Sequence, residues 1–162
     1  MALTNFHEDI TDDVQKHAPY GYTTKTNWDN ARVRSLTVTL SSADILALNT
    51  TDIEIVPSVI GKVHIPIFSS IKLDFNSIAY ASGSVVLLYY DNTTTGTYAI
   101  SVSGAALIQS SVDQFGANYS PLSLDFALSL LENKPLVIGC STAFVNGNST
   151  MDVTIHYLSI DV

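Results

Sequence analysis

The C-terminal segment, residues 150–162, is the feature that most constrains the fold of this chain. Its side chains alternate in character, which is the period-two pattern of a β-strand with one buried face. One face carries Val153, Ile155, Tyr157 and Ser159, and the other carries Thr154, His156, Leu158 and Ile160. Asn146-Gly147-Asn148 precedes this segment, and Asn-Gly is a strong signal for a short hairpin turn. We therefore expect residues 135–144 and 150–162 to pair as a hairpin.

Apolar runs indicate further strands earlier in the chain. They fall at residues 36–40, 53–57, 62–75, 84–90, 98–102 and 122–126. Pro66 lies inside the third run and predicts an edge position or a bulge, because proline cannot donate to a strand ladder. Short helical turns are expected at residues 42–48, with Ser42 as the N-cap, at 104–112 and, as an alternative to a strand, at 124–131.

The spacing of these runs predicts an all-β domain over residues 35–162. About eight strands recur at intervals of roughly 8–15 residues, and the longer spacing of βαβ units is absent. A β-sandwich of the jelly-roll type is the expected architecture. An immunoglobulin-like sandwich is the alternative, although its Cys…Trp…Cys spacing is missing from the sequence.

Residues 1–34 differ from the rest of the chain, because they gather charges and lack a regular apolar period. We predict a non-globular N-terminal arm that has no core of its own and docks onto a partner protein. Docking is favoured over a free tail because the segment is rich in aromatic side chains. The residues expected to make the contact are Phe6, Tyr20, Tyr22, Trp28, Arg32 and Arg34.

The charge balance narrows the classes of partner. Seven Lys and Arg stand against fifteen Asp and Glu, for a net charge of −8. Binding a phosphate backbone requires clustered cations, so nucleic acid is not an expected partner, and an anionic membrane surface is disfavoured for the same reason. No apolar stretch approaches the roughly 18 residues of a membrane-spanning helix. Cys140 is the one cysteine and lies in an apolar run, which predicts a buried, inert thiol and no disulfide.

No motif for chemistry is present. Glycine-rich phosphate loops, metalloprotease and nucleophile-elbow motifs and calcium loops are all missing, so we expect no catalytic residue and no cofactor. His64 and His156 are each placed by the alternation on the solvent side of a strand. If those strands paired, the two imidazoles would bind a metal together with Asp152 or Asp74, as in a cupin-like enzyme, but hydrated surface histidines are the favoured interpretation.

Residues 35–75 resemble small structural virion proteins of tailed bacteriophages and prophages. The stretch reads SLTVTLSSADILALNTTDIEIVP and then GKVHIPIFSSIKLDF, a pattern of strand, turn, strand, Gly-Lys corner and long strand. The continuation AYASGSVVLLYY and the closing VTIHYLSIDV also fit. The similarity covers residues 35–162 and leaves the arm unmatched. It departs from the expected pattern at residues 58–60, where a corner richer in Gly and Pro is typical.

The resemblance implies a structural role in the virion. It points to a capsid decoration or head-fibre subunit that binds other virion proteins and forms a homo-oligomer, with a trimer favoured. The run at residues 84–90 is apolar on both faces and is the expected subunit interface, through Val85, Leu87 and Tyr89. The alternative is a tail-associated receptor-binding or carbohydrate-binding adhesin that offers Tyr90 and Tyr98 to host-surface glycans, although core packing is favoured for these tyrosines.

Overall fold

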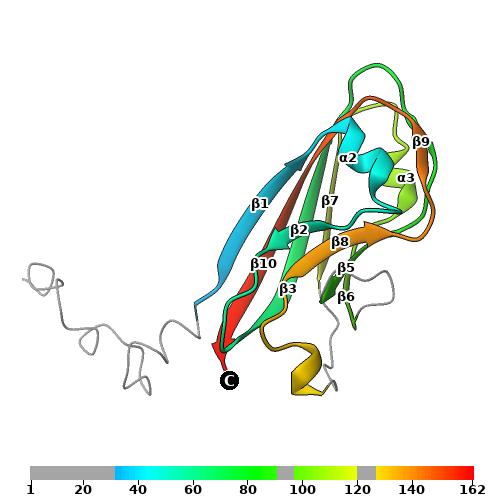
Figure 1. Ribbon diagram of the computed structural model, residues 1–162. Coiled ribbons are helices and arrows are strands. Elements are labelled where there is room, and N and C mark those ends of the chain that lie inside the picture. The colour runs from blue at the N-terminus through cyan, green and yellow to red at the C-terminus, as the bar shows by residue number, and fades with distance from the viewer. Residues whose placement is uncertain (1–31, 91–96, 120–126) are drawn as a thin grey trace, which may run out of the picture.

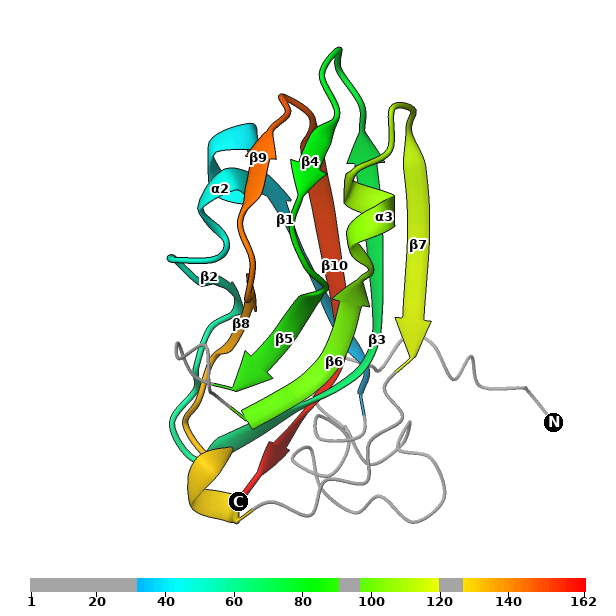
Figure 2. The same cartoon turned by 90° about the vertical axis from the view of Figure 1, so that its right-hand side faces the viewer.

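The chain folds as an all-β domain in a computed structural model that describes residues 32–90, 97–119 and 127–162. Two four-stranded sheets form two layers, and a short two-stranded ribbon lies at one end (Figures 1 and 2). Every described strand pair is antiparallel. The predicted fold class is therefore confirmed. The predicted arm, residues 1–34, lies outside the described residues except for its last three, and Arg34 is already the first residue of a strand.

The first sheet has the order β1-β10-β3-β7. Its strands are β1 (Arg34–Leu40), β10 (Thr150–Asp161), β3 (Lys62–Asp74) and β7 (Gln114–Tyr119). β10 is the last strand in the sequence, yet it lies inside the sheet between β1 and β3. Both edges of this sheet are therefore formed by strands from earlier in the chain.

The second sheet has the order β2-β8-β5-β6, and a ribbon pairs β4 with β9. The sheet strands are β2 (Ile53–Val56), β8 (Leu136–Cys140), β5 (Val86–Tyr90) and β6 (Thr97–Ser103). The ribbon consists of β4 (Tyr80–Ser82) and β9 (Phe144–Asn146). The run at residues 84–90, which is apolar on both faces, contains β5, and β5 lies between β8 and β6.

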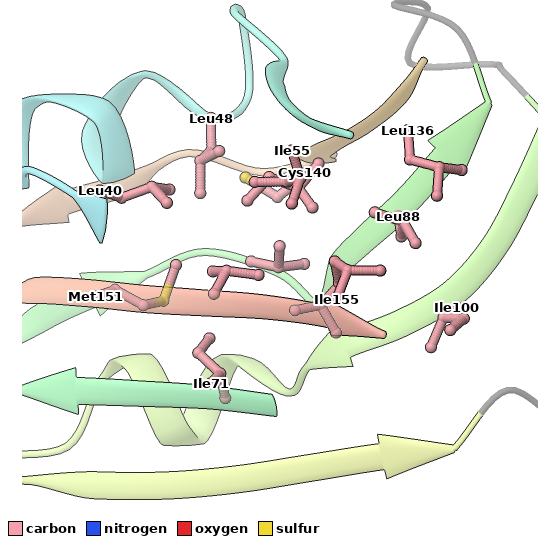
Figure 3. Packing of buried hydrophobic residues seen from close by; sticks show 14 of the residues in the cluster. Leu40, Leu48, Ile55, Ile71, Leu88, Ile100, Leu136, Cys140, Met151 and Ile155 are labelled. Atoms are coloured by element: carbon pink, nitrogen blue, oxygen red, sulfur yellow. The ribbon is translucent and has the colours of Figure 1, made fainter. Parts of the chain in front are cut away.

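The core fills the space between the two sheets (Figure 3). Along β10 every second side chain from Met151 to Ser159 is buried, as the alternation predicted. Ile155 of β10, which is 0% exposed, faces the second sheet, where Leu88 and Leu136 are also fully buried. Burying one such side chain contributes roughly 1.5–3 kcal/mol relative to leaving it in water, so these rows hold the layers together.

β3 contains the bulge that Pro66 predicted. Tyr157 of β10 pairs with Pro66 and the preceding His156 pairs with Phe68, so Ile67 is an extra residue in β3. One extra residue exchanges the two faces of a strand. Before the bulge the even-numbered residues His64 and Pro66 are therefore buried, whereas after it the odd-numbered residues Ser69 and Ile71 are buried.

The predicted helical turns are present but short. α2 (Ser42–Ala47) begins with a capping box: the Asp44 N–H donates to the Ser41 hydroxyl oxygen, and the Ser41 N–H donates to the Asp44 carboxylate. The N-cap is thus Ser41, and the prediction of Ser42 was wrong by one residue. α3 (Ala105–Ile108) and the 3-10 turn η1 (Leu128–Leu130) occupy the other two expected positions. Figure 1 shows α2 and α3 at one end of the sandwich and η1 at the other.

The predicted C-terminal hairpin is wrong. Asn146 and Gly147 do adopt positive φ angles of 57° and 80°, the conformation that favours Asn-Gly turns. The turn joins β9 to β10, however, and these two strands do not pair with each other. β9 pairs with β4, whereas β10 pairs with β1 and β3. β8 belongs to the opposite sheet. The turn therefore leads from the ribbon into the first sheet.

Candidate functional site

The two histidines that were predicted as a possible metal pair lie on opposite faces of the first sheet. His64 pairs with Ser159 in the inward row, and His156 pairs with Phe68 in the outward row. The prediction that His64 faces solvent was wrong, because the bulge at Ile67 turns this part of β3 over. One metal ion cannot bind both imidazoles. Within the described ranges, no group of three or more His, Cys, Asp and Glu is arranged to hold a metal.

His64 has a structural environment. Its Nε2 lies 3.0 Å from the Pro57 carbonyl oxygen, and its ring meets the Tyr157 ring edge-on at 5.3 Å. Burial lowers the pKa of His64, although the bond to Pro57 acts in the opposite direction. The Tyr90 hydroxyl donates a 2.5 Å bond to the backbone oxygen of His64. Burial therefore favours the neutral form of the imidazole, which packs in the core.

The tyrosines proposed as a glycan platform do not form one in the described residues. Tyr90 is 1% exposed, so the favoured alternative of core packing is confirmed for this residue. Burial raises the pKa of the Tyr90 hydroxyl, which remains a hydrogen-bond donor. Tyr98 belongs to β6, but its side chain lies outside the described part of the chain.

Cys140 is buried, as predicted. Its Sγ–H donates to the Thr142 carbonyl oxygen at 3.2 Å, and burial raises the pKa of the thiol. Desolvation also raises the pKa of Asp52 nearby, whose Oδ1 is buried without a hydrogen-bond partner beside Gly139. A raised thiol pKa disfavours the nucleophilic thiolate.

The residues predicted to bind partners are only partly placed. Phe6, Tyr20, Tyr22 and Trp28 lie outside the described residues. Arg32 is exposed, and Arg34 is half-buried in β1 opposite Tyr157. The predicted oligomer interface is also divided: Val85 is 40% exposed, Leu87 is half-buried, and Tyr89 is buried within its own chain. Both sets of contacts stay predictions.

A first exposed apolar surface, the end patch, was not found from the sequence. It consists of Val59, Ile60, Leu128, Leu130 and Val162. Ile60 is 93% exposed and the others are 41–52% exposed. Hydrogen bonds hold its three segments together, because Gly61 N–H donates to Asn133 Oδ1 at 2.6 Å and Val162 N–H donates to the Gly61 oxygen at 3.1 Å. Figures 1 and 2 both show η1 and the C-terminus at this end.

A second exposed surface crosses the outer face of the first sheet. His156, Phe68 and Tyr119 lie side by side on β10, β3 and β7 and form the aromatic row. Their neighbouring ring centroids are 5.3 and 5.1 Å apart. Tyr119 is 79% exposed, and Phe115 on the same face of β7 is 70% exposed. The alternation of residues 114–119 could have shown this strand, but it was not recognised.

The described residues contain no helix with the length and apolar character needed to cross a membrane. No protein-family model matches the sequence, and no curated protein matches it. Among solved structures, the chain is similar to a chain titled cyanophage Pam1 capsid asymmetric unit, with a TM-score of 0.45 and 12% identity. The alignment covers 93% of this chain and 98% of that one. A likeness at this level assigns no function to the chain.

Proposed function

We propose that this chain is a structural subunit of a bacteriophage virion, a capsid decoration or head-fibre protein that binds other virion proteins and catalyses no reaction. The observation that carries the proposal is the end patch. Large apolar side chains scattered singly on a surface are ordinary. The end patch instead gathers five of them on three segments that hydrogen bonds join, and groups of exposed apolar residues mark interaction sites. β1 begins toward the same end of the sandwich (Figure 1).

The strand order supports the jelly-roll part of the prediction. Sheets ordered β1-β10-β3-β7 and β2-β8-β5-β6 contain eight strands, and the chain passes between the layers as in two Greek keys. Jelly rolls occur in viral capsid proteins and in lectins. The fold alone does not select a function, so the sequence resemblance over residues 35–162 and the end patch together favour the virion over the lectin.

The alternative is a tail-associated receptor-binding or carbohydrate-binding adhesin. The structure weakens this alternative, because the Tyr90 ring that was expected to contact glycans is buried. A trimer through Val85 and Leu87 stays part of the proposal, because both residues keep some exposure.

Mass spectrometry and immunogold labelling of purified virions test the proposal. The particles are those of the phage or induced prophage that encodes the chain. We expect the protein in mature particles, with label on the head. Its absence from purified virions would overturn the virion role. Label confined to the tail would overturn the decoration or head-fibre assignment and favour the adhesin.

The docking surface is tested with point variants in the same particles. Ile60→Asp places a charge in the end patch, and we expect its occupancy on virions to fall at least tenfold. Ile78→Asp is the matched control, because Ile78 is also exposed, at 54%, but follows the far end of β3. Deletion of residues 1–31 tests the arm separately. Equal occupancy of the Ile60 and Ile78 variants would show that the end patch is not the docking surface.

A further inference from the structure

Beyond the bulge in β3, the outer face of the first sheet is open to solvent. The outward side chains of this surface, the open face, alternate along residues 35–39, 150–156, 68–74 and 115–119, and each of them is exposed or half-buried. The four strands lie side by side (Figure 2), so residues opposite each other form rows across the sheet. The chemistry of these rows indicates what the open face can bind.

Aromatic rings cover one row and one edge of the open face. In the aromatic row, His156, Phe68 and Tyr119 have neighbouring ring centroids 5.3 and 5.1 Å apart and ring planes tilted by 50° and 52°. Phe115 adds a fourth ring on β7, and its side chain is 70% exposed. The aromatic row spans two strand spacings, or about 10 Å. Such rings present apolar faces of negative electrostatic character, which attract weakly polarised C–H groups.

The inward side of β7 explains why its rings are held on the open face. A Cβ on Gly116 would overlap the Leu107 side chain of α3, so this position accepts no larger residue without rearrangement. Asn118 Nδ2 donates a 2.7 Å bond to the Val102 oxygen of β6. A one-residue slip of β7 would push an aromatic ring against α3 and break this bond. The exposed rings are therefore fixed in place before any ligand arrives.

Hydroxyl groups lie directly beside the aromatic row. Thr154 lies two residues before His156 on β10, so both side chains point outward. Ser70 lies two residues after Phe68 on β3 and points outward for the same reason. Thr154 Oγ1 lies 2.7 Å from Thr37 Oγ1 on β1. A hydroxyl donates one hydrogen bond and accepts two, so this pair keeps the capacity to bond a ligand.

The charges of the open face are already paired. Lys72 is the one Lys or Arg among its described outward residues, and its Nζ lies 2.6 Å from Asp74 Oδ1. Asp152, opposite Lys72, accepts a 2.5 Å bond from Thr39 Oγ1. The two carboxylates exceed the ammonium by one negative charge. Aromatic platforms that stack single-stranded nucleic acid add a cationic groove, and sulfate or phosphate groups require cations as well. An anionic ligand therefore does not fit the open face.

We propose that the open face binds a neutral oligosaccharide. A sugar unit has an apolar C–H face and an edge of hydroxyl groups and carries no charge, which is the combination that the open face complements. Sugar rings stack on Tyr119 and Phe115, and their hydroxyls bond Thr154, Ser70 and Asp152. A sheet face covers only one side of a ligand, whereas tight small-molecule sites are concave. We therefore expect a dissociation constant on the order of 1 mM for one chain.

This site goes beyond the virion role and does not depend on it. The open face shares no residue with the end patch, and it contains neither Tyr90 nor Tyr98, the tyrosines that were expected to contact glycans. A subunit that docks through the end patch keeps the open face available. The two proposals are also tested separately, because saccharide binding is measured on the purified chain and docking is measured on particles.

Saturation-transfer NMR on the purified full chain tests the proposal, because this method detects weak binding. The probes are the neutral hexasaccharides maltohexaose, cellohexaose and mannohexaose, and hexagalacturonate is the anionic counterpart of matched length. We expect at least one neutral probe to receive magnetisation from the protein at about tenfold the expected Kd, and hexagalacturonate to receive none. Transfer to none of the three neutral probes, or stronger transfer to hexagalacturonate, would overturn the proposal.

Point variants locate the binding surface. Tyr119→Ala and Phe115→Ala each remove an exposed ring, and we expect each to raise the Kd of the bound neutral probe about tenfold. Ile78→Ala is the matched control and should leave the Kd unchanged, because Ile78 is exposed and apolar but follows the end of β3, outside the open face. Circular dichroism verifies that all three variants fold. A Kd that neither ring substitution changes would place saccharide binding elsewhere and overturn the proposal.

Discussion

At the residue scale, His64 links protonation to stability. Its ring is buried, its Nε2 lies against the Pro57 oxygen, and its Nδ1 has no hydrogen-bond partner. Burial lowers the pKa of His64 from its ordinary value of 6.5, and the nearby Arg34 and Lys62 charges lower it further. In the unfolded chain the imidazole returns to that ordinary value. The unfolded state therefore binds this proton more readily than the folded state does.

The sign of the pH effect follows from that difference. Stability rises with pH wherever the unfolded state holds more protons. We predict that the free energy of unfolding falls as the pH drops below about 6.5, by at most about 1.4 kcal/mol per pH unit from this group. Urea unfolding between pH 5 and 8 measures it. His64→Gln should flatten the slope in this range and His156→Gln should preserve it, so identical slopes for the wild type and His64→Gln would contradict the prediction.

At the element scale, α2 depends on its N-terminal cap. The Asp44 backbone N–H donates to Ser41 Oγ at 3.3 Å, and the Ser41 backbone N–H donates to Asp44 Oδ2 at 2.8 Å. The hydrogen bonds from Ser41 hold the pKa of Asp44 below its usual value. We predict that Ser41→Ala lowers the free energy of unfolding by about 1 kcal/mol. Ser42→Ala, one position inside the helix, should cost much less in the same thermal unfolding experiment, and equal losses would contradict Ser41 as the cap.

Element positions could be predicted from the sequence where a pattern reports local packing. The alternation of residues 150–162 identified the buried face of β10, and Pro66 identified the bulge. The consequence of that bulge for His64 was missed, because one inserted residue reverses every side chain beyond it. The hairpin was wrong because Asn146-Gly147 determines a turn, whereas strand pairing is decided by contacts far apart in the sequence. The end patch was missed because a run such as Val59-Ile60 reads the same whether it is buried or exposed.

At the scale of the whole molecule, the order of the strands makes the fold depend on its last segment. β10 separates β1 from β3, so the first sheet has no continuous ladder without it. Its fully buried side chains, such as Met151 and Ile155, also cover the inner face of the second sheet (Figure 3). Residues 1–31, by contrast, precede the first described strand.

We therefore predict opposite effects for the two terminal truncations. A chain that ends at Asn148 should show no cooperative urea transition, because β1 loses the only described strand it pairs with and the inner face of the second sheet meets water. A chain that begins at Arg32 should keep the cooperative transition of the full chain. A synthetic peptide of residues 149–162 added to the first variant separates the causes: it should restore strand signal by circular dichroism if the missing strand alone is at fault. A cooperative transition in the chain that ends at Asn148 would contradict the prediction, because it would mean that the two sheets hold together without β10.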